Sequence, residues 1–202
     1  MLVSSLYNIV DQFFIGRSVG ALGNAATNIS FPLSISCVAI ALLFGIGGAS
    51  AFNIAMGMGE KENAVNYLAN SAAMLFLGGV ALTAVTLIFL EPLLKFFGSP
   101  DNVLEYAKVY TRIVALGFPF LIFTSGGGHL IRADGRPKIS MVCNLAGALI
   151  NTVLDALFVF VLNMGMAGAA YATIIGQIVS GLMAAWYLAH CRTCLLYTSD
   201  AA

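Results

Sequence analysis

The feature that most constrains this chain is a succession of long apolar segments joined by short connections. At the α-helical rise of about 1.5 Å per residue, all but the first are long enough to cross a hydrocarbon core of about 30 Å. The segments must be helices because the core offers no water to backbone groups, and the period-two alternation of a membrane β-barrel is absent. The expected fold class is all-α: a polytopic membrane protein with a bundle of six transmembrane helices. The segments span residues 1–15, 25–56, 67–94, 106–131, 139–162 and 168–189, and the first is expected to be truncated.

The composition indicates a lipid-embedded chain and excludes a water-soluble globule. Charged residues make up 9% of the 202 residues, whereas soluble domains carry roughly 25%. Hydrophobic residues make up 60%, and the mean hydropathy is +0.94. The formal net charge is zero, which removes the electrostatic attraction on which nucleic-acid binding depends. We therefore expect the lipid bilayer as a partner and no nucleic acid.

The C-terminal end of the chain has two unusual features. Cys191 and Cys194 form a C-x-x-C pattern, but nothing nearby completes a metal site. The run from Leu195 to Ser199 looks like translated sequencing-adapter DNA rather than protein. The expected division is a transmembrane lobe over residues 1–193 and a non-native, adapter-derived tail over residues 194–202.

Short connections with turn residues predict that successive helices run antiparallel. The connections after the second, fourth and sixth segments should then lie on one side of the membrane. The basic residues of these connections cluster most densely between residues 132 and 138, in the connection after the fourth segment. This cluster predicts that the side is cytoplasmic. The basic residues on this side are Lys61, Arg132, Arg136, Lys138 and Arg192.

Polar side chains form stripes inside three of the apolar segments, and two acids lie among them. An acid within a span costs at least about 2.5 kcal/mol on insertion scales, so it indicates function. Asp155 follows Asn144 and Asn151 at helical spacing on the fifth segment. Thr173, Gln177 and Ser180 repeat in the same way on the sixth segment, and Ser4, Asn8 and Asp11 on the first. Plain packing through interhelical hydrogen bonds is the alternative interpretation of such stripes.

Helix-breaking residues also lie at membrane depth. Pro32 and Pro119 remove backbone hydrogen bonds and predict bends, and the run from Gly126 to Gly128 permits close approach of a neighbouring helix. Transporters that move their helices use the same residues, as does ordinary membrane packing.

Several motifs, in their order and spacing, resemble those of the multidrug and toxic compound extrusion (MATE) family. The resemblance covers essentially residues 2–192. The motifs are Leu6 to Arg17, Ser30 to Leu33, Gly57 to Ala64, Ile131 to Gly135, Asn151 to Asp155 and Gly165 to Thr173.

The resemblance implies two six-helix lobes around a V-shaped cavity, of which this chain would supply the first, leaving the C-terminal lobe as its missing partner. It also implies a cation site at Asp11, Asn151, Asp155 and Thr173, and substrate-cavity candidates at Tyr7, Asn8, Asn144 and Gln177. One departure is Ala156, where many members of the family have proline after the acid. That substitution leaves a bend of the fifth helix in doubt.

The expected function is secondary active antiport, in which a drug-like organic cation leaves as H⁺ or Na⁺ enters. No catalytic residue, organic cofactor or resident metal is expected, and Na⁺ is the alternative occupant of the cation site. Flipping of a lipid-linked oligosaccharide and a non-transporting membrane fragment are the alternative functions. An intramembrane aspartyl protease is disfavoured because Asp155 follows Thr152-Val153-Leu154 and not Gly-x-Gly.

Overall fold

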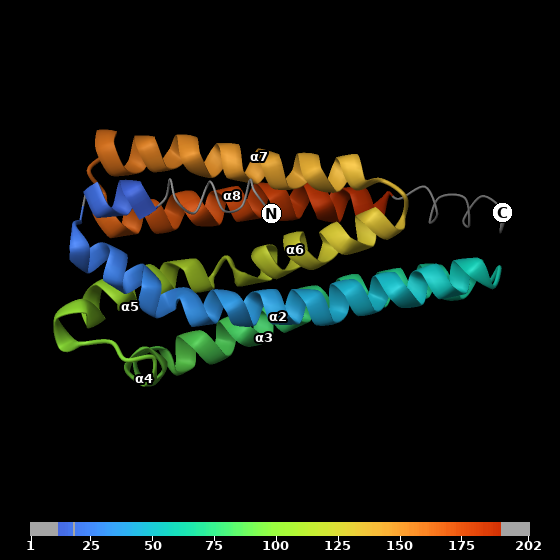
Figure 1. Cartoon of the computed structure of the whole chain (residues 1–202), viewed down its shortest axis with the longest axis horizontal. Helices are drawn as coiled ribbons and strands as arrows, with labels where there is room; N and C mark the ends of the chain where they lie inside the picture. The colour runs from blue at the N-terminus through green and yellow to red at the C-terminus, as the bar shows by residue number, and fades with distance from the viewer. Residues whose placement is uncertain (1–11, 18, 191–202) are drawn as a thin grey trace.

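The computed structural model describes residues 12–17 and 19–190, which form helices and turns and contain no β-strand (Figure 1). Residues 12–17 are helical. The helices that follow are α2 (Ala21–Gly57), α3 (Lys61–Ile88), α4 (Leu90–Phe96), α5 (Asp101–Ala115), α6 (Phe118–Ala133), α7 (Pro137–Asp155), the π-helix η1 (Ala156–Val161) and α8 (Gly165–Ala189). The predicted all-α class is confirmed.

Four helical stretches of the described chain are long and apolar enough to cross a membrane, and a bent pair makes a fifth. Helix α2 covers the second predicted segment, α7 with η1 covers the fifth, and α8 covers the sixth. The third segment is divided at Phe89, where α3 ends and the short α4 begins. The first predicted segment lies mostly outside the described residues.

The fourth predicted segment is a broken span. Helices α5 and α6 meet at an angle of 56° across Leu116 and Gly117. Pro119 stands in the first turn of α6, where its missing N–H costs least and its ring prevents α5 from continuing. A carbonyl freed at the end of α5 is satisfied from α3, because the Thr83 hydroxyl donates to the oxygen of Ala115 at 2.7 Å.

Pro32, in contrast, lies inside the 37-residue helix α2 and does not interrupt it. The Ser36 hydroxyl donates to the Pro32 carbonyl at 3.0 Å. The proline at the start of α6 therefore coincides with a break in the chain, whereas the proline inside α2 is accommodated within a continuous helix, as membrane helices often allow.

The long helices run along the long axis of the molecule, with α6 at the centre, whereas the short α4 is seen nearly end-on (Figure 1). Helix α6 packs against α2 and α3 on one side and against α7 and α8 on the other. Helices α7 and α8 pack along each other, and α5 reaches both α2 and α8. The two helix pairs therefore contact each other mainly through α6 and α5.

The turns after α2 and α6 reverse the chain by the same device. Glycines 59 and 135 take φ values of 78° and 79°, a left-handed conformation that only glycine adopts without strain. The N–H of the next residue bonds back to the carbonyl five residues earlier, from Glu60 to Ala55 and from Arg136 to Ile131, as in a Schellman motif. Both turns and the end of α8 lie at one end of the molecule (Figure 1). The predicted antiparallel order is therefore observed, and the cytoplasmic assignment of this end stays a prediction.

Glycines determine how closely α2 and α6 approach. A Cβ atom built on Gly45 would lie 2.6 Å from the Cα and 2.7 Å from the carbonyl oxygen of Gly126. Backbone atoms cannot rotate away as a side chain can, so this contact exists only because both positions lack a side chain. Gly47, two residues on, has open space around it.

We expect Gly45→Ala to lower the stability of the purified chain by about 1–3 kcal/mol, because the added methyl group overpacks the α2–α6 contact. The matched control Gly47→Ala should be neutral or stabilising by up to about 1 kcal/mol, since alanine favours the helix. Thermal unfolding in detergent measures both changes. Equal effects of the two substitutions would show that the close contact is absent.

At the opposite end of the molecule, ion pairs hold α4 against α5. The Glu91 carboxylate lies 2.8 Å from Lys108 Nζ and 2.7 Å from Lys95 Nζ. The hydrogen bonds from Lys108 and then Lys95 lower the pKa of Glu91 from 4.5 to about 2. A lowered carboxyl pKa means that these contacts are complete above about pH 4.5 and are lost as the pH falls toward 2.

Lys108→Ala should therefore raise the pKa of Glu91 toward 4.5, and Lys95→Ala should raise it less, because Lys108 is the larger contributor. A carboxyl ¹³C titration followed by NMR measures both shifts. A larger effect of Lys95→Ala would contradict the geometry.

Candidate functional site

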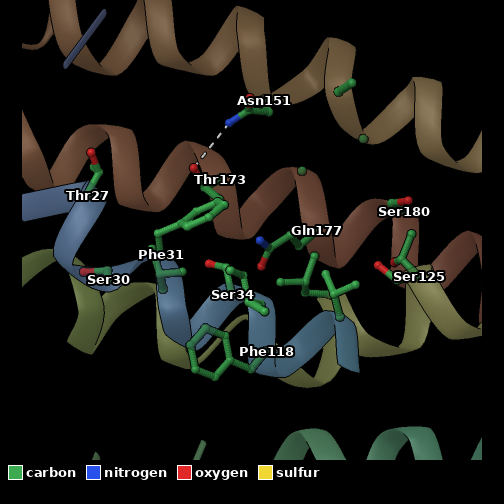
Figure 2. Close-up of a pocket in the computed structure, with 18 of the residues that line it drawn as sticks. Thr27, Ser30, Phe31, Ser34, Phe118, Ser125, Asn151, Thr173, Gln177 and Ser180 are labelled. Atoms are coloured by element: carbon green, nitrogen blue, oxygen red, sulfur yellow. Dashed lines mark hydrogen bonds between the residues drawn. The ribbon is translucent and has the colours of Figure 1, made fainter. Parts of the chain in front are cut away.

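A cavity of about 370 Å³ opens between the two sides of the bundle, and Figure 2 shows the side chains that line it. Its walls come from the residue 12 region, α2, α5, α6, α7 and α8. Many of these side chains are uncharged and polar, and the described lining contains no charged residue. The polar lining residues are Gln12, Thr27, Ser30, Ser34, Tyr110, Thr111, Thr124, Ser125, Asn144, Asn151, Thr173, Gln177 and Ser180.

Asn151 on α7 and Thr173 on α8 meet across this cavity (Figure 2). The Asn151 Nδ2 group donates to Thr173 Oγ1 at 3.4 Å, and the Thr173 hydroxyl donates to the Ala169 carbonyl at 3.0 Å. Asn151 is 4% exposed. Two of the residues predicted to form a cation site are therefore in contact, and both line the cavity.

Glycines bring α7 and α8 close enough for this contact. A Cβ atom on Gly176 would lie 2.7 Å from the Gly147 carbonyl oxygen and 3.0 Å from Asn151 Cβ. One turn of α8 further on, the Ser180 hydroxyl donates across the same helix pair to the Cys143 carbonyl at 2.8 Å. The predicted polar stripes of the fifth and sixth segments thus face each other.

Asp155 is fully buried, with an exposed fraction of 0%. It is the last residue of α7, four positions after Asn151, which places it about 6 Å further along the helix axis. The π-helix η1 begins at the next residue, Ala156. The fifth helix therefore departs from α-geometry at the acid without the proline of the family, and π-turns of this kind often accompany functional sites.

Three of the predicted residues, Asp11, Tyr7 and Asn8, lie outside the described residues. The neighbouring residue Gln12 lines the cavity, and its Nε2 donates to Thr27 Oγ1 on α2 at 2.8 Å. Asn144 and Gln177, the other predicted substrate-cavity residues, also line it.

The cavity contains polar residues that the sequence analysis missed. Thr27, Ser30 and Ser34 recur at helical spacing on α2 and make a stripe like those on α7 and α8. Ser30 is tied to Thr111 of α5 by a 2.6 Å hydroxyl–hydroxyl hydrogen bond. The stripe on α2 could have been found by its period, whereas Thr111, Thr124 and Ser125 carry no such signal and line the cavity from the two helices of the broken span, α5 and α6.

The chemistry of the described lining is that of neutral oxygen donors. Within the described residues no three His, Cys, Asp or Glu side chains are grouped to hold a metal ion. A buried carboxylate can accept a proton, and together with neighbouring amide and hydroxyl oxygens it can ligate a hard monovalent cation, whereas none of these groups is a soft ligand for a transition metal.

Comparison with known proteins matches this arrangement to one family. The family model described as MatE matches residues 1–157. The multidrug export protein MepA of Staphylococcus haemolyticus (strain JCSC1435) is 28% identical over 183 residues, which are 90% of this chain and 40% of that protein.

Solved structures agree in fold. A crystal structure of MATE in the bent conformation matches with a TM-score of 0.85 and 30% identity over 92% of this chain and 41% of that chain. An inward-facing multidrug resistance MATE family transporter of the MOP superfamily matches with a TM-score of 0.84 and 30% identity, covering 91% of this chain and 41% of that chain.

The chain thus spans about 40% of the length of the relatives that it matches. Its apolar helices, together with the bacterial membrane transporters to which it is similar, make it a multi-pass membrane protein. Because the family model covers more than half of its residues, the chain belongs to the MatE family.

Proposed function

We propose that this chain is the first lobe of a secondary active antiporter that exports drug-like organic cations in exchange for H⁺ or Na⁺. The observation that carries the proposal is a fully buried acid, Asp155, one helical turn from an amide that lines a polar cavity inside an apolar bundle. A buried acid in a membrane bundle is costly, and such acids mark ion pathways. The names of the relatives add support, because they describe multidrug export and transport.

In the proposed mechanism Asp155, Asn151 and Thr173 form the cation site together with Asp11. A proton or a Na⁺ ion taken up there cancels the negative charge of the buried carboxylate. The amide of Asn151 and the hydroxyl of Thr173, which already contact each other, change partners when the charge is cancelled. The site thereby links ion occupancy to the packing of α7 on α8.

The substrate would occupy the adjoining cavity, with Asn144 and Gln177 in its walls and Tyr7 and Asn8 as further candidates. Apolar residues such as Phe31, Ile35 and Phe118 share those walls. Mixed apolar and neutral polar walls accommodate organic ions of different shapes, because few contacts depend on exact geometry.

The available driving force is large enough to move the helices. One elementary charge crossing 100 mV releases about 2.3 kcal/mol, and a pH difference of one unit adds about 1.4 kcal/mol. Sums of this size shift a two-state equilibrium by more than a hundredfold. Catalysis is not part of the proposal, and no organic cofactor enters it.

One test of the proposal concerns export by the complete transporter, obtained by recovering the full reading frame. Asp155→Asn and Asp11→Asn should each reduce ion-driven efflux of a cationic dye by at least about tenfold, because an amide cannot exchange a proton and binds Na⁺ less strongly. Fluorescence of preloaded cells measures the efflux. Asp101→Asn, which changes an exposed acid at the start of α5, is the matched control and should leave efflux unchanged.

Unchanged efflux in both site variants would overturn the coupling mechanism. Everted vesicles with either a pH gradient or a Na⁺ gradient separate the two ions. A transporter that fails to export any cationic dye or fluoroquinolone, yet moves a lipid-linked oligosaccharide, would replace drug export by the flippase alternative. A complete protein that moves neither would favour a non-transporting role.

A separate test of the proposal concerns Thr173. Thr173→Val removes the hydroxyl that joins α8 to Asn151, and we expect it to lower stability by about 0.6–1.7 kcal/mol and to abolish the thermal stabilisation by Na⁺ or low pH. Thr173→Ser should preserve both. Thr152→Val is the matched control because the Thr152 hydroxyl donates within its own helix, to the Ala148 carbonyl. Stabilisation by the ion that survives in Thr173→Val would remove this residue from the site.

A further inference from the structure

A second hollow, which we call the α7–α8 groove, lies near the end of the molecule where α6 turns into α7. Its volume is about 470 Å³. Lys138 and Tyr187 are its polar lining residues. The other walls are apolar and include Val142 of α7 and Leu182, Met183 and Trp186 of α8. Helical spacing places these residues on the sides of α7 and α8 away from Asn144, Asn151, Thr173 and Gln177, so the groove opens on the outer face of the helix pair.

The apolar walls of the groove are exposed rather than covered within the described chain. Leu182 is 57% exposed and Trp186 is 69% exposed. In a membrane protein such a surface faces lipid acyl chains. A concave surface binds an acyl chain more tightly than a flat surface does, because it contacts more of the acyl chain.

Positive charge stands at one end of the groove. Lys138 lies in its wall, in the first turn of α7, and Arg136 is the residue that precedes this helix. The first turn of α7 contains no acid, although the N-terminal end of a helix favours negative charge. Both side chains are exposed, and neither forms an ion pair with another described residue.

The acid nearest in sequence to these cations has another partner. Asp134 accepts a 2.6 Å hydrogen bond from the hydroxyl of Tyr187, a groove residue on α8. The carboxylate of Asp134 is thus held toward α8. Two cations at the positive end of a helix, without an acid in that turn, create a site that an anion stabilises.

Only an amphiphile satisfies both parts of this surface. A soluble anion would leave the apolar walls uncovered, and a neutral lipid would leave the cations unneutralised. The adjacent aromatic residues Trp186 and Tyr187 belong to the types that gather where acyl chains meet headgroups. Basic pockets between helices on the cytoplasmic side of a membrane bind anionic headgroups in the same way.

We propose that the α7–α8 groove binds an anionic glycerophospholipid, with one acyl chain along Val142, Leu182 and Trp186 and the phosphate at Lys138 and Arg136. The lipid would then pack on the outer face of the two helices whose inner faces carry Asn151 and Thr173. This inference is independent of the proposed transport function, because it requires only the described surface and a bilayer.

The only tryptophan of the 202-residue chain, Trp186, lies in the groove and makes the proposal directly measurable. The chain is reconstituted in vesicles of phosphatidylcholine with a minor, fixed fraction of phosphatidylglycerol. Bromine, which quenches tryptophan fluorescence, is placed on the acyl chains either of the phosphatidylglycerol or of an equal amount of the phosphatidylcholine. The lipid composition is the same in both samples, so any difference reports which lipid contacts Trp186.

We expect the brominated phosphatidylglycerol to occupy the groove about fivefold or more in excess of its share of the lipid, since each cation near the surface contributes about fivefold. The double variant Arg136→Ala/Lys138→Ala should lose this preference while quenching by phosphatidylcholine persists, and thermal unfolding in detergent checks that the variant is folded. Lys61→Ala, which removes a cation at the same end of the molecule but on α3, is the matched control and should retain the preference.

Three results would overturn the proposal. Equal quenching by the two labels in the unaltered chain means ordinary bilayer contact. Weak quenching by both means that protein, such as a second copy of the chain, covers the groove. An equal loss of preference in Lys61→Ala means that the surface charge of this end acts without a site.

Discussion

The structure depends on one constraint, which is that a hydrocarbon environment offers no hydrogen-bond partner to a polar group. Backbone groups satisfy their hydrogen bonds by forming helices, and the carbonyl freed at the end of α5 accepts a hydrogen bond from Thr83 of α3. Polar side chains form hydrogen bonds with one another, as Asn151 and Thr173 do. The polar cavity is therefore the place where side chains that cannot face lipid are collected, and the proposed ion and substrate sites lie there for that reason.

Close backbone contacts decide where that cavity lies. Gly45 against Gly126 brings α2 onto α6, and Gly147 against Gly176 brings α7 onto α8. The α2–α6 and α7–α8 contacts are each tight, whereas the space between these helices stays open as the polar cavity. Small residues thus do more than permit packing, because they divide the bundle into two tight halves with a cavity between them.

The pair α7 and α8 has two faces of different chemistry. The inner face carries amide and hydroxyl oxygens near the buried Asp155. The outer face carries an apolar groove with cations at its end. An ion on one side and a lipid on the other would act on the same helix contact, so the composition of the bilayer and the occupancy of the proposed ion site are expected to be coupled through α7.

The sequence by itself determined the class, the antiparallel order and most of the polar stripes, because hydropathy, turn glycines and helical period are local properties. It predicted that Asn151 and Thr173 belong to one site, and the structure places them in contact, while the roles of these two residues, of Asp155 and of Asp11 stay predictions. Only the tertiary structure decided that Pro119 ends a helix whereas Pro32 does not. It alone also placed Thr111 beside Ser30. The physical reason is that the effect of a proline, or the partner of a lone hydroxyl, depends on the groups that neighbouring helices bring to it, and those neighbours are far away in the sequence.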